Sequence, residues 1–209
     1  MIDKTHFNAF KPAYGAAGER QTLPAGIYEG HICDATVDAS NGFQTLILYV
    51  EIDQGEYANF YHQDYEAQKN GLFSSDAKYR GRYRIQLPDG QNTEHDNWRQ
   101  HALEGAVWAI EDGNPGFRWD WDETKLKGKK VGLNVREREY YYNGRSGVTT
   151  EIGRLESVTQ MHNPDERKRP KPMWKRELSA SDKARRDRDQ AVDNGYVEVT
   201  DEELPWSRG

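Results

Sequence analysis

Hydrophobic and polar residues alternate along several short stretches between residues 23 and 160. In "NGFQTLILYVEID" (41–53) the alternation is clearest, because apolar residues occupy every second position at Leu46, Leu48, Val50 and Ile52. This period of two is typical of a strand that buries one face. The preceding segment, "LPAGIYEGHICDATV" (23–37), predicts another strand that begins at a Pro-Gly turn. Asn41-Gly42 separates the two and is the strongest hairpin signal in the chain.

In the next two stretches of the chain, the alternation of hydrophobic and polar residues is less regular. A third strand is expected in "EYANFYHQDY", at about residues 57–62, which includes Tyr61. The segment that follows, including "KYRGRYRIQLPDG" (78–90), is expected to be irregular.

The segment 94–116 predicts the main helix, because apolar residues recur at helical spacing at Trp98, Ala102, Val107 and Ile110. We expect Asp96 to be its N-cap, and Gly113 with Pro115 to end it. A second hairpin follows, formed by "VGLNVREREYYY" (131–142) and "VTTEIGRLESV" (148–158), with its turn at Asn143-Gly144.

The predicted order is therefore three strands, one helix and two strands. This is the order of the oligonucleotide-binding fold, a mainly-β, five-stranded Greek-key barrel with a helix between its third and fourth strands. We predict one such domain at residues 23–160, an N-terminal arm at 1–22, a basic linker at 161–195 and an acidic tail at 196–209. Within the linker, "SASDKARRDRDQAV" (179–192) is expected to form a short solvated helix.

Composition and charge limit the classes of function. The single cysteine, Cys33, excludes an intramolecular disulfide and a multi-cysteine zinc site, and is interpreted as a small buried strand residue. No secretion signal, membrane-length apolar run or coiled-coil heptad is present, so we expect a cytoplasmic protein and no membrane partner. The net charge is −6, yet residues 167–188 contain ten basic and three acidic residues.

No motif predicts catalysis or a cofactor. The "RWDWDE" stretch carries Asp120, Asp122 and Glu123, which leaves a metal-dependent nuclease as one alternative. His95 and His101 do not share a helix face, and both are expected at the surface. There is no Gly-rich phosphate loop and no Ser-His-Asp signature, so we expect a protein that is not an enzyme and binds no metal.

Basic and aromatic residues interleave in three stretches: "KYRGRYR", "VREREYYYNGR" and "NFYH". Single strands bind to basic grooves that follow the phosphates and to aromatic rings on which bases stack. Strand alternation places Tyr140 and Tyr142 on one face and Tyr141 on the other. The predicted DNA-binding residues are Tyr49, Tyr61, Arg80, Arg82, Arg136, Arg138, Tyr140, Tyr142 and Arg145. A salt-bridged solvated edge, or a sugar-binding surface, is the alternative interpretation.

Several motifs resemble the single-stranded DNA-binding proteins of phages that infect Gram-positive bacteria. The likeness rests on "LPAGIYEGHICDATV", "AIEDGNPGFRWDWDETKLKGKKVGLNV", "REREYYYNG" and "RLESVTQ", and it covers about residues 23–160. The resemblance implies an oligonucleotide-binding fold, non-catalytic work in replication or recombination, and a place in the host cytoplasm. The chain has "VREREYYY" where that family has a more acidic strand, so the site residues above are taken from this sequence alone.

The C-terminal "DEELPW" is similar to the acidic tips of bacterial single-strand binding proteins, which dock on replication and repair partners. The residues concerned are Asp201, Glu202, Glu203, Leu204, Pro205 and Trp206, with three more residues after them. Together these features predict a sequence-independent single-stranded DNA-binding protein. A non-catalytic replication or recombination adaptor, acting mainly through this tail, is the second alternative.

Overall fold

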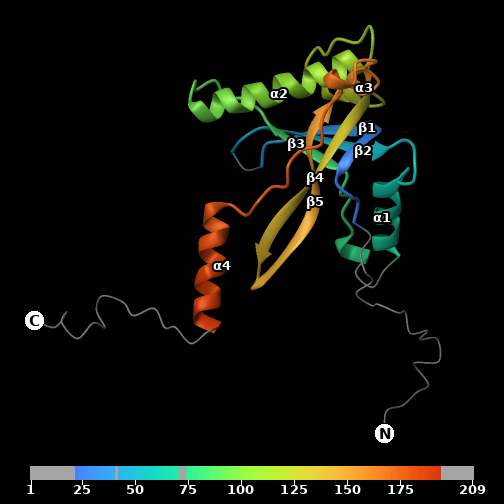
Figure 1. Cartoon of the computed structure of the whole chain (residues 1–209). Helices are drawn as coiled ribbons and strands as arrows, with labels where there is room; N and C mark the ends of the chain where they lie inside the picture. The colour runs from blue at the N-terminus through green and yellow to red at the C-terminus, as the bar shows by residue number, and fades with distance from the viewer. Residues whose placement is uncertain (1–21, 41, 71–73, 194–209) are drawn as a thin grey trace, which may run out of the picture.

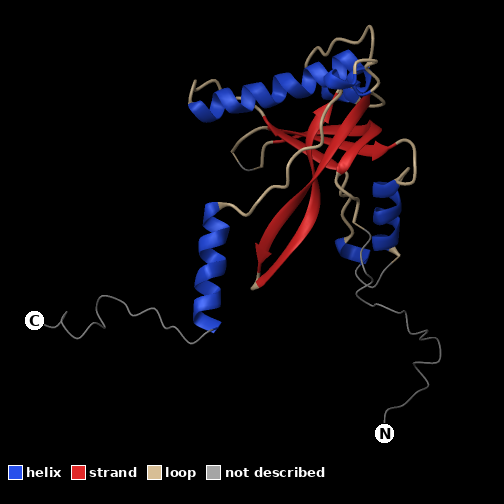
Figure 2. Ribbon diagram, viewed as in Figure 1, coloured by secondary structure: helices blue, strands red, loops and turns tan. Residues whose placement is uncertain are grey.

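The computed structural model describes residues 22–40, 42–70 and 74–193, in which one antiparallel sheet is surrounded by helices (Figure 1; Figure 2). The strands follow the order β3-β2-β1-β4-β5. They are β1 (Gly26–Asp38), β2 (Thr45–Ile52), β3 (Arg82–Gln86), β4 (Lys130–Tyr142) and β5 (Arg145–Glu156). The helices are α1 (Phe60–Lys69), α2 (Glu94–Gly113), α3 (Val158–Met161) and α4 (Ala180–Asp193), with short 3-10 turns η1 (Ser74–Asp76), η2 (Glu123–Leu126) and η3 (Glu166–Lys168).

Both predicted hairpins are confirmed. β1 and β2 pair up to Asp38 opposite Thr45, on either side of the predicted turn, although Asn41 itself lies outside the described residues. β4 and β5 pair up to Tyr142 opposite Arg145. Asn143 and Gly144 between them have φ angles of 49° and 73°, which is the backbone that an Asn-Gly hairpin turn requires.

The predicted third strand is wrong, because residues 57–62 enter helix α1. Asn59 adopts a left-handed φ of 58° and turns the chain. The Glu51 carboxylate, on β2, then accepts hydrogen bonds from the backbone N–H groups of Tyr61 and His62, at 3.0 and 2.6 Å. A carboxylate at a helix N-terminus satisfies free N–H groups and interacts favourably with the helix dipole.

The actual third strand, β3, lies inside the stretch that was expected to be irregular. Tyr83 and Ile85 face Leu48 and Leu46 of β2, so β3 joins the sheet as an edge strand. The helix after it was predicted correctly as α2, but its N-cap is Thr93, whose side chain accepts from the N–H of Asp96 at 3.1 Å.

The core lies between one face of the sheet and α2. From the sheet come Leu46, Leu48, Val50, Ile52, Val131, Leu133 and Leu155, and from α2 come Leu103, Ala106, Ala109 and Ile110. The sheet is not closed into a barrel: β3 and β5 are its two edges, and in the described chain neither pairs with the other. The candidate site lies along this opening between β3 and β5.

The segment after α3 packs along β4. The buried Asn134 side chain donates to the carbonyl of Lys171 at 2.9 Å and accepts from the N–H of Met173 at 3.1 Å. Arg176 continues the contact through backbone hydrogen bonds to Glu137 and Glu139, both 2.8 Å. We name residues 171–178 the strap, because they run along β4 and cover its edge beyond Val135, where its pairing with β1 ends.

The predicted solvated helix in the linker is confirmed as α4. It is held against the β4–β5 hairpin by a hydrogen bond of 2.5 Å from the Tyr141 hydroxyl to Asp189. None of the helices in the described residues is both long enough and apolar enough to cross a bilayer.

Candidate nucleic-acid interface

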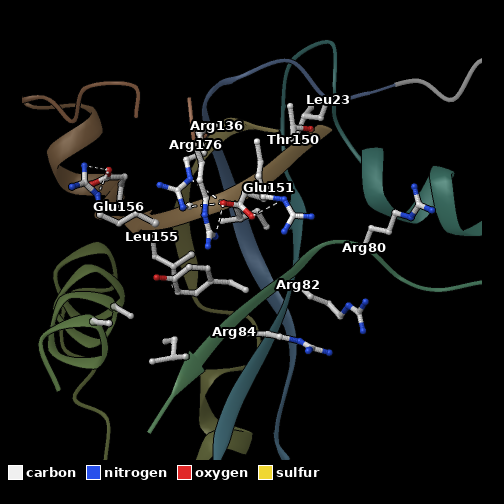
Figure 3. Close-up of a pocket in the computed structure, with 18 of the residues that line it drawn as sticks. Leu23, Arg80, Arg82, Arg84, Arg136, Thr150, Glu151, Leu155, Glu156 and Arg176 are labelled. Carbon is white, nitrogen blue, oxygen red and sulfur yellow. Dashed lines mark hydrogen bonds and ion pairs between the residues drawn. The ribbon is translucent and has the colours of Figure 1, made fainter. Parts of the chain in front are cut away.

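A groove of about 1220 Å³ runs between the edge strands β3 and β5 and reaches α2 (Figure 3). Its floor is the rim of the core, where Ile85, Leu155 and Ala106 are buried. Small-molecule pockets measure roughly 300–1,000 Å³. The groove is larger than that range and is open along the seam of the sheet, so its dimensions suit a segment of polymer.

The charge of the groove is opposite to that of the whole chain. Although the chain carries −6, the residues that line the groove include seven arginines and three carboxylates. The arginines are Arg80, Arg82, Arg84, Arg136, Arg138, Arg154 and Arg176, and the carboxylates are Asp64, Glu151 and Glu156. Guanidinium groups form forked hydrogen bonds to phosphate, which makes this surface suited to a polyanion.

One carboxylate, Glu151, lies at the centre of three of these arginines (Figure 3). Its Oε1 accepts from Arg136 Nε and Nη2 at 3.0 and 2.9 Å, and from Arg176 Nη1 at 3.3 Å. Arg138 Nε lies 3.4 Å from Oε2. Three cations around one anion leave a local excess of two positive charges, and an incoming backbone phosphate, with one negative charge, would halve that excess.

Arg138 retains donor capacity within this group, which we name the Glu151 cluster. Its Nε is buried, and it makes no hydrogen bond to any residue that the structure describes. A buried donor without an acceptor costs about 1–3 kcal/mol. The Arg138 side chain as a whole is 44% exposed and lines the groove, so an anion can approach its guanidinium from the groove.

The β3 side of the groove carries Arg80, Arg82 and Arg84, which extend away from the Glu151 cluster in Figure 3. Arg82 pairs with Tyr49 of β2 in the sheet register. It therefore shares the outer face of the sheet with Tyr49, and β3 joins that face to the groove. Arg80 is the only one of the three with an ion pair among the described residues, to Asp64 at 3.8 Å.

The β4–β5 hairpin continues the Glu151 cluster outward. Arg138, Tyr140 and Tyr142 follow Arg136 at every second position of β4, so they lie on one face of the hairpin. The side chains of Tyr140 and Tyr142 are 39% and 68% exposed, whereas Tyr141 on the opposite face is 7% exposed. The predicted alternation is thus confirmed, and Arg145 lies opposite Tyr142 at the tip.

The structure brings together some of the predicted DNA-binding residues and separates others. Arg80, Arg82, Arg136 and Arg138 line the groove, while Tyr140, Tyr142 and Arg145 lie on the adjoining hairpin. Tyr61 borders the groove but is only 7% exposed, with its ring packed on Phe60 and 6.3 Å from Tyr79. Stacking with a base needs an open ring face, so Tyr61 is left out of the proposal below.

Sequence reasoning missed Arg84, Arg154, Arg176 and Glu151, and two tryptophans of α2, Trp98 and Trp108. Arg84 belongs to the same "KYRGRYR" stretch as Arg82, so the signal was present. Arg176 was counted only as linker charge. Exposed tryptophans cannot be distinguished from core tryptophans by helical spacing alone.

In the stretch "RWDWDE", Asp120 and Asp122 have structural roles. The Asp120 carboxylate pairs with Lys125, whose hydrogen bond lowers the pKa of Asp120. Asp122 caps η2 by accepting from the N–H of Thr124 at 3.0 Å. Across the described chain, no three His, Cys, Asp or Glu side chains are grouped so as to hold a metal ion.

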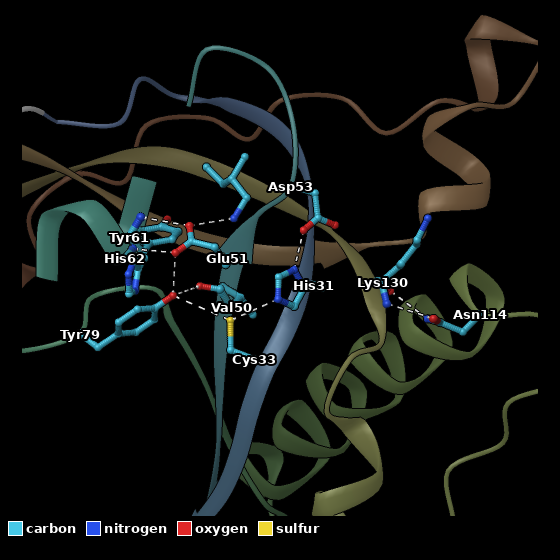
Figure 4. Close-up of polar contacts among 11 residues, drawn as sticks. His31, Cys33, Val50, Glu51, Asp53, Tyr61, His62, Tyr79, Asn114 and Lys130 are labelled. Atoms are coloured by element: carbon cyan, nitrogen blue, oxygen red, sulfur yellow. Dashed lines mark hydrogen bonds and ion pairs between the residues drawn. The ribbon is translucent and has the colours of Figure 1, made fainter. Parts of the chain in front are cut away.

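A second cavity, of about 540 Å³, opens beside α1 (Figure 4). Glu51 is 4% exposed there, and besides capping α1 it accepts from the Tyr79 hydroxyl at 3.0 Å. The cavity is lined by His31, Cys33, Asp34, Tyr49, Glu51, Asn59, His62 and Tyr79. Glu51 therefore serves the fold, by joining α1 to β2.

Cys33 in this cavity is half-buried. Its thiol, the imidazole of His31 and the carboxylate of Asp53 follow one another in a row. Its Sγ is 3.5 Å from His31 Nε2, and His31 Nδ1 is 2.5 Å from Asp53 Oδ1. Burial raises the pKa of the Cys33 thiol, and the carboxylates of Glu51 and Asp53 raise it further. A raised pKa favours the protonated thiol over the thiolate, which is the nucleophilic form.

The predicted partner-binding tail, Asp201 to Trp206, lies outside the described residues. Comparisons with known proteins give no assignment of function, so the proposal below rests on the geometry of the site. No protein-family model matches the sequence, and no curated protein matches it either.

Proposed function

We propose that this protein binds single-stranded DNA without sequence preference, through the groove between β3 and β5 and the adjoining face of the β4–β5 hairpin. The observation that carries the proposal is the groove lining: seven arginines and three carboxylates in a chain of net charge −6. Phosphate contacts supply most of the affinity in sequence-independent binding. No reaction is assigned to the site.

The architecture supports an oligonucleotide-binding type of fold. α2 lies between β3 and β4, and β3 and β5 contact each other besides pairing with β2 and β4. Such barrels are partly open, and an opening between β3 and β5 places the groove along their unpaired edges. The resemblance of several sequence motifs to phage single-stranded DNA-binding proteins agrees with this assignment, and we extend the proposal to a role in phage replication or recombination.

The residues divide into two kinds of contact. The Glu151 cluster and the β3 rim are suited to bind phosphates. Bases can stack on the exposed ring of Tyr142 and on the partly exposed ring of Tyr140, which lies over Gly147. From Arg136 to Tyr142 the strand spans roughly 20 Å at about 3.4 Å per residue. The hairpin therefore extends the contact surface by several nucleotides beyond the groove.

The test is the anisotropy of a labelled oligo-dT of ~30 nucleotides, titrated with the full chain at several salt concentrations. We expect the logarithm of the binding constant to fall linearly with the logarithm of the salt concentration, with a slope of roughly −0.7 for each phosphate neutralised. Arg82→Ala/Arg138→Ala should weaken binding by roughly tenfold or more at low salt and reduce the slope.

A matched control is Arg118→Ala/Arg167→Ala. It removes the same charge from arginines that lie outside the groove and are 80% and 90% exposed. If both double variants weaken binding equally, the groove is not the binding site. If the wild-type chain binds no oligonucleotide, the function is wrong, and an adaptor that acts through its tail becomes the better explanation.

A further inference from the structure

The α2 side of the groove is aromatic rather than basic. Trp98 and Trp108 both line the groove, and their side chains are 68% and 53% exposed. Residues 98, 101, 105 and 108 recur at helical spacing, so they form one stripe along α2. At 1.5 Å per residue the two indoles are separated by about 15 Å along the helix axis.

Between the two indoles the helix surface is open. Gly105 lies there in the middle of α2 and also lines the groove. A glycine inside a helix is unfavourable relative to alanine. A Cβ at Gly105 would meet no atom within 4 Å, so packing within the described chain does not require a glycine. The open space is therefore on the solvent side, where a ligand can enter.

The two sides of the groove differ in chemistry, as the two sides of an unpaired nucleotide chain do. One side has the arginines, with Arg136, Arg138 and Arg176 around Glu151. The other has the exposed indoles of Trp98 and Trp108, with His101 and Gly105 between them on the same stripe. Phosphates match the first side and flat base rings match the second. In a duplex the base faces are stacked on one another and cannot reach such indoles.

We infer that Trp98 and Trp108 are base-stacking residues, and that α2, together with the tyrosines of the β4–β5 hairpin, selects unpaired strands over duplex. This inference rests on the proposed function, since it assigns the base contacts of the same groove. It adds two binding residues that the interleaved basic and aromatic stretches do not contain.

The experiment compares three labelled probes of equal phosphate number: oligo-dT, an abasic deoxyribose-phosphate oligomer and a duplex. The full chain is compared with Trp98→Ala/Trp108→Ala. Wild type should bind oligo-dT more tightly than the abasic oligomer by roughly 5- to 150-fold for each stacked base. The double variant should bind the abasic oligomer as wild type does, and its preference for oligo-dT over the abasic oligomer and over duplex should shrink to the part that Tyr140 and Tyr142 supply.

Two further variants separate stacking from folding. Gly105→Leu places a strong helix former in the open space, so it should melt no earlier than wild type and still bind oligo-dT several-fold less tightly. Trp121→Ala removes an indole that is 71% exposed outside the groove, and it should leave all three affinities unchanged.

The outcomes separate the two proposals. If wild type binds oligo-dT and the abasic oligomer equally, or if the α2 double variant keeps the full wild-type preference for dT, the stacking role of Trp98 and Trp108 is overturned and phosphate binding stands. If none of the probes binds, the proposed function fails and the stacking role with it.

Discussion

A substitution of Glu151 tests whether the same carboxylate stabilises the fold and weakens the binding of phosphate in the groove. Its carboxylate forms ion pairs with Arg136, Arg138 and Arg176 at 2.9, 3.4 and 3.3 Å, and its side chain is 24% exposed. Partly exposed pairs contribute about 0.5 kcal/mol each. Glu151→Gln keeps the shape and one oxygen acceptor, so we expect the free energy of unfolding to fall by about 1.5 kcal/mol. For a chain of this size that lowers Tm by roughly 3–6 °C.

The same substitution should strengthen DNA binding. It removes one negative charge from the groove, and a unit charge about 7 Å from a phosphate contributes about 0.6 kcal/mol in water. That is about threefold in affinity for oligo-dT at low salt, with a steeper dependence on salt concentration. The assay combines thermal melting of the free protein with anisotropy titrations at several salt concentrations.

Glu166→Gln is the matched control for Glu151→Gln. Glu166 is 82% exposed in its pair with Arg169, outside the groove. Its removal changes the net charge equally, and we expect little change in Tm or in affinity. Weaker DNA binding by Glu151→Gln, or an unchanged Tm, would refute the view that Glu151 stabilises the fold while competing with phosphate.

Three other measurements test the fold and its electrostatics. Glu51→Ala leaves the N–H groups of Tyr61 and His62 without their acceptor; we expect urea denaturation to show a loss of about 2–4 kcal/mol, and an unchanged midpoint would contradict the capping role. Burial raises the pKa of Tyr61 and Tyr79 above 10, so their contribution to stability is complete below pH 10 and is lost as the pH rises further. The Tm should therefore stay level up to about pH 10 and then fall as phenolate absorbance appears. Ionisation of all tyrosines at pH 10 without unfolding would contradict this expectation. Since burial raises the pKa of the Cys33 thiol, its alkylation by iodoacetamide should have a pH midpoint above that of a free thiol, and a midpoint below it would show an activated cysteine.

The sequence was informative wherever a signal is local. Alternating residues and the two Asn-Gly turns located β1, β2, β4 and β5, and helical spacing located α2. Each of these features depends on neighbours a few residues apart.

The third strand was misplaced because its signal is not local. Tyrosines favour strands, but Asn59 turns the chain, and the carboxylate of Glu51, on another element, then caps α1. In β3, Arg82 and Arg84 alternate with Tyr83 and Ile85 as an edge strand should. The surrounding glycine and charges concealed that pattern within a stretch interpreted as irregular.

The candidate site was predicted only in part, because the groove is formed by segments distant in the chain. The groove residues come from Arg80 and β3, from 98–108 of α2, 136–138 of β4 and 149–156 of β5, and from Arg176 of the strap, and they meet only in the folded molecule. The basic and aromatic stretches identified the β3 and β4 contributions. The tryptophans of α2 could not be assigned from helical spacing, which does not tell which face of a helix the fold covers.

The most direct test of the central claim is to map where a single strand contacts the chain. Oligo-dT that contains photoreactive 5-iodo-deoxyuridine would be crosslinked to the full protein, and the modified peptides identified by mass spectrometry. We expect crosslinks at the aromatic residues of the groove and hairpin, namely Trp98, Trp108, Tyr140 and Tyr142, and we expect added salt to reduce these crosslinks. Crosslinks confined to residues 117–130, or none at any of these four side chains while the oligonucleotide is bound, would contradict it.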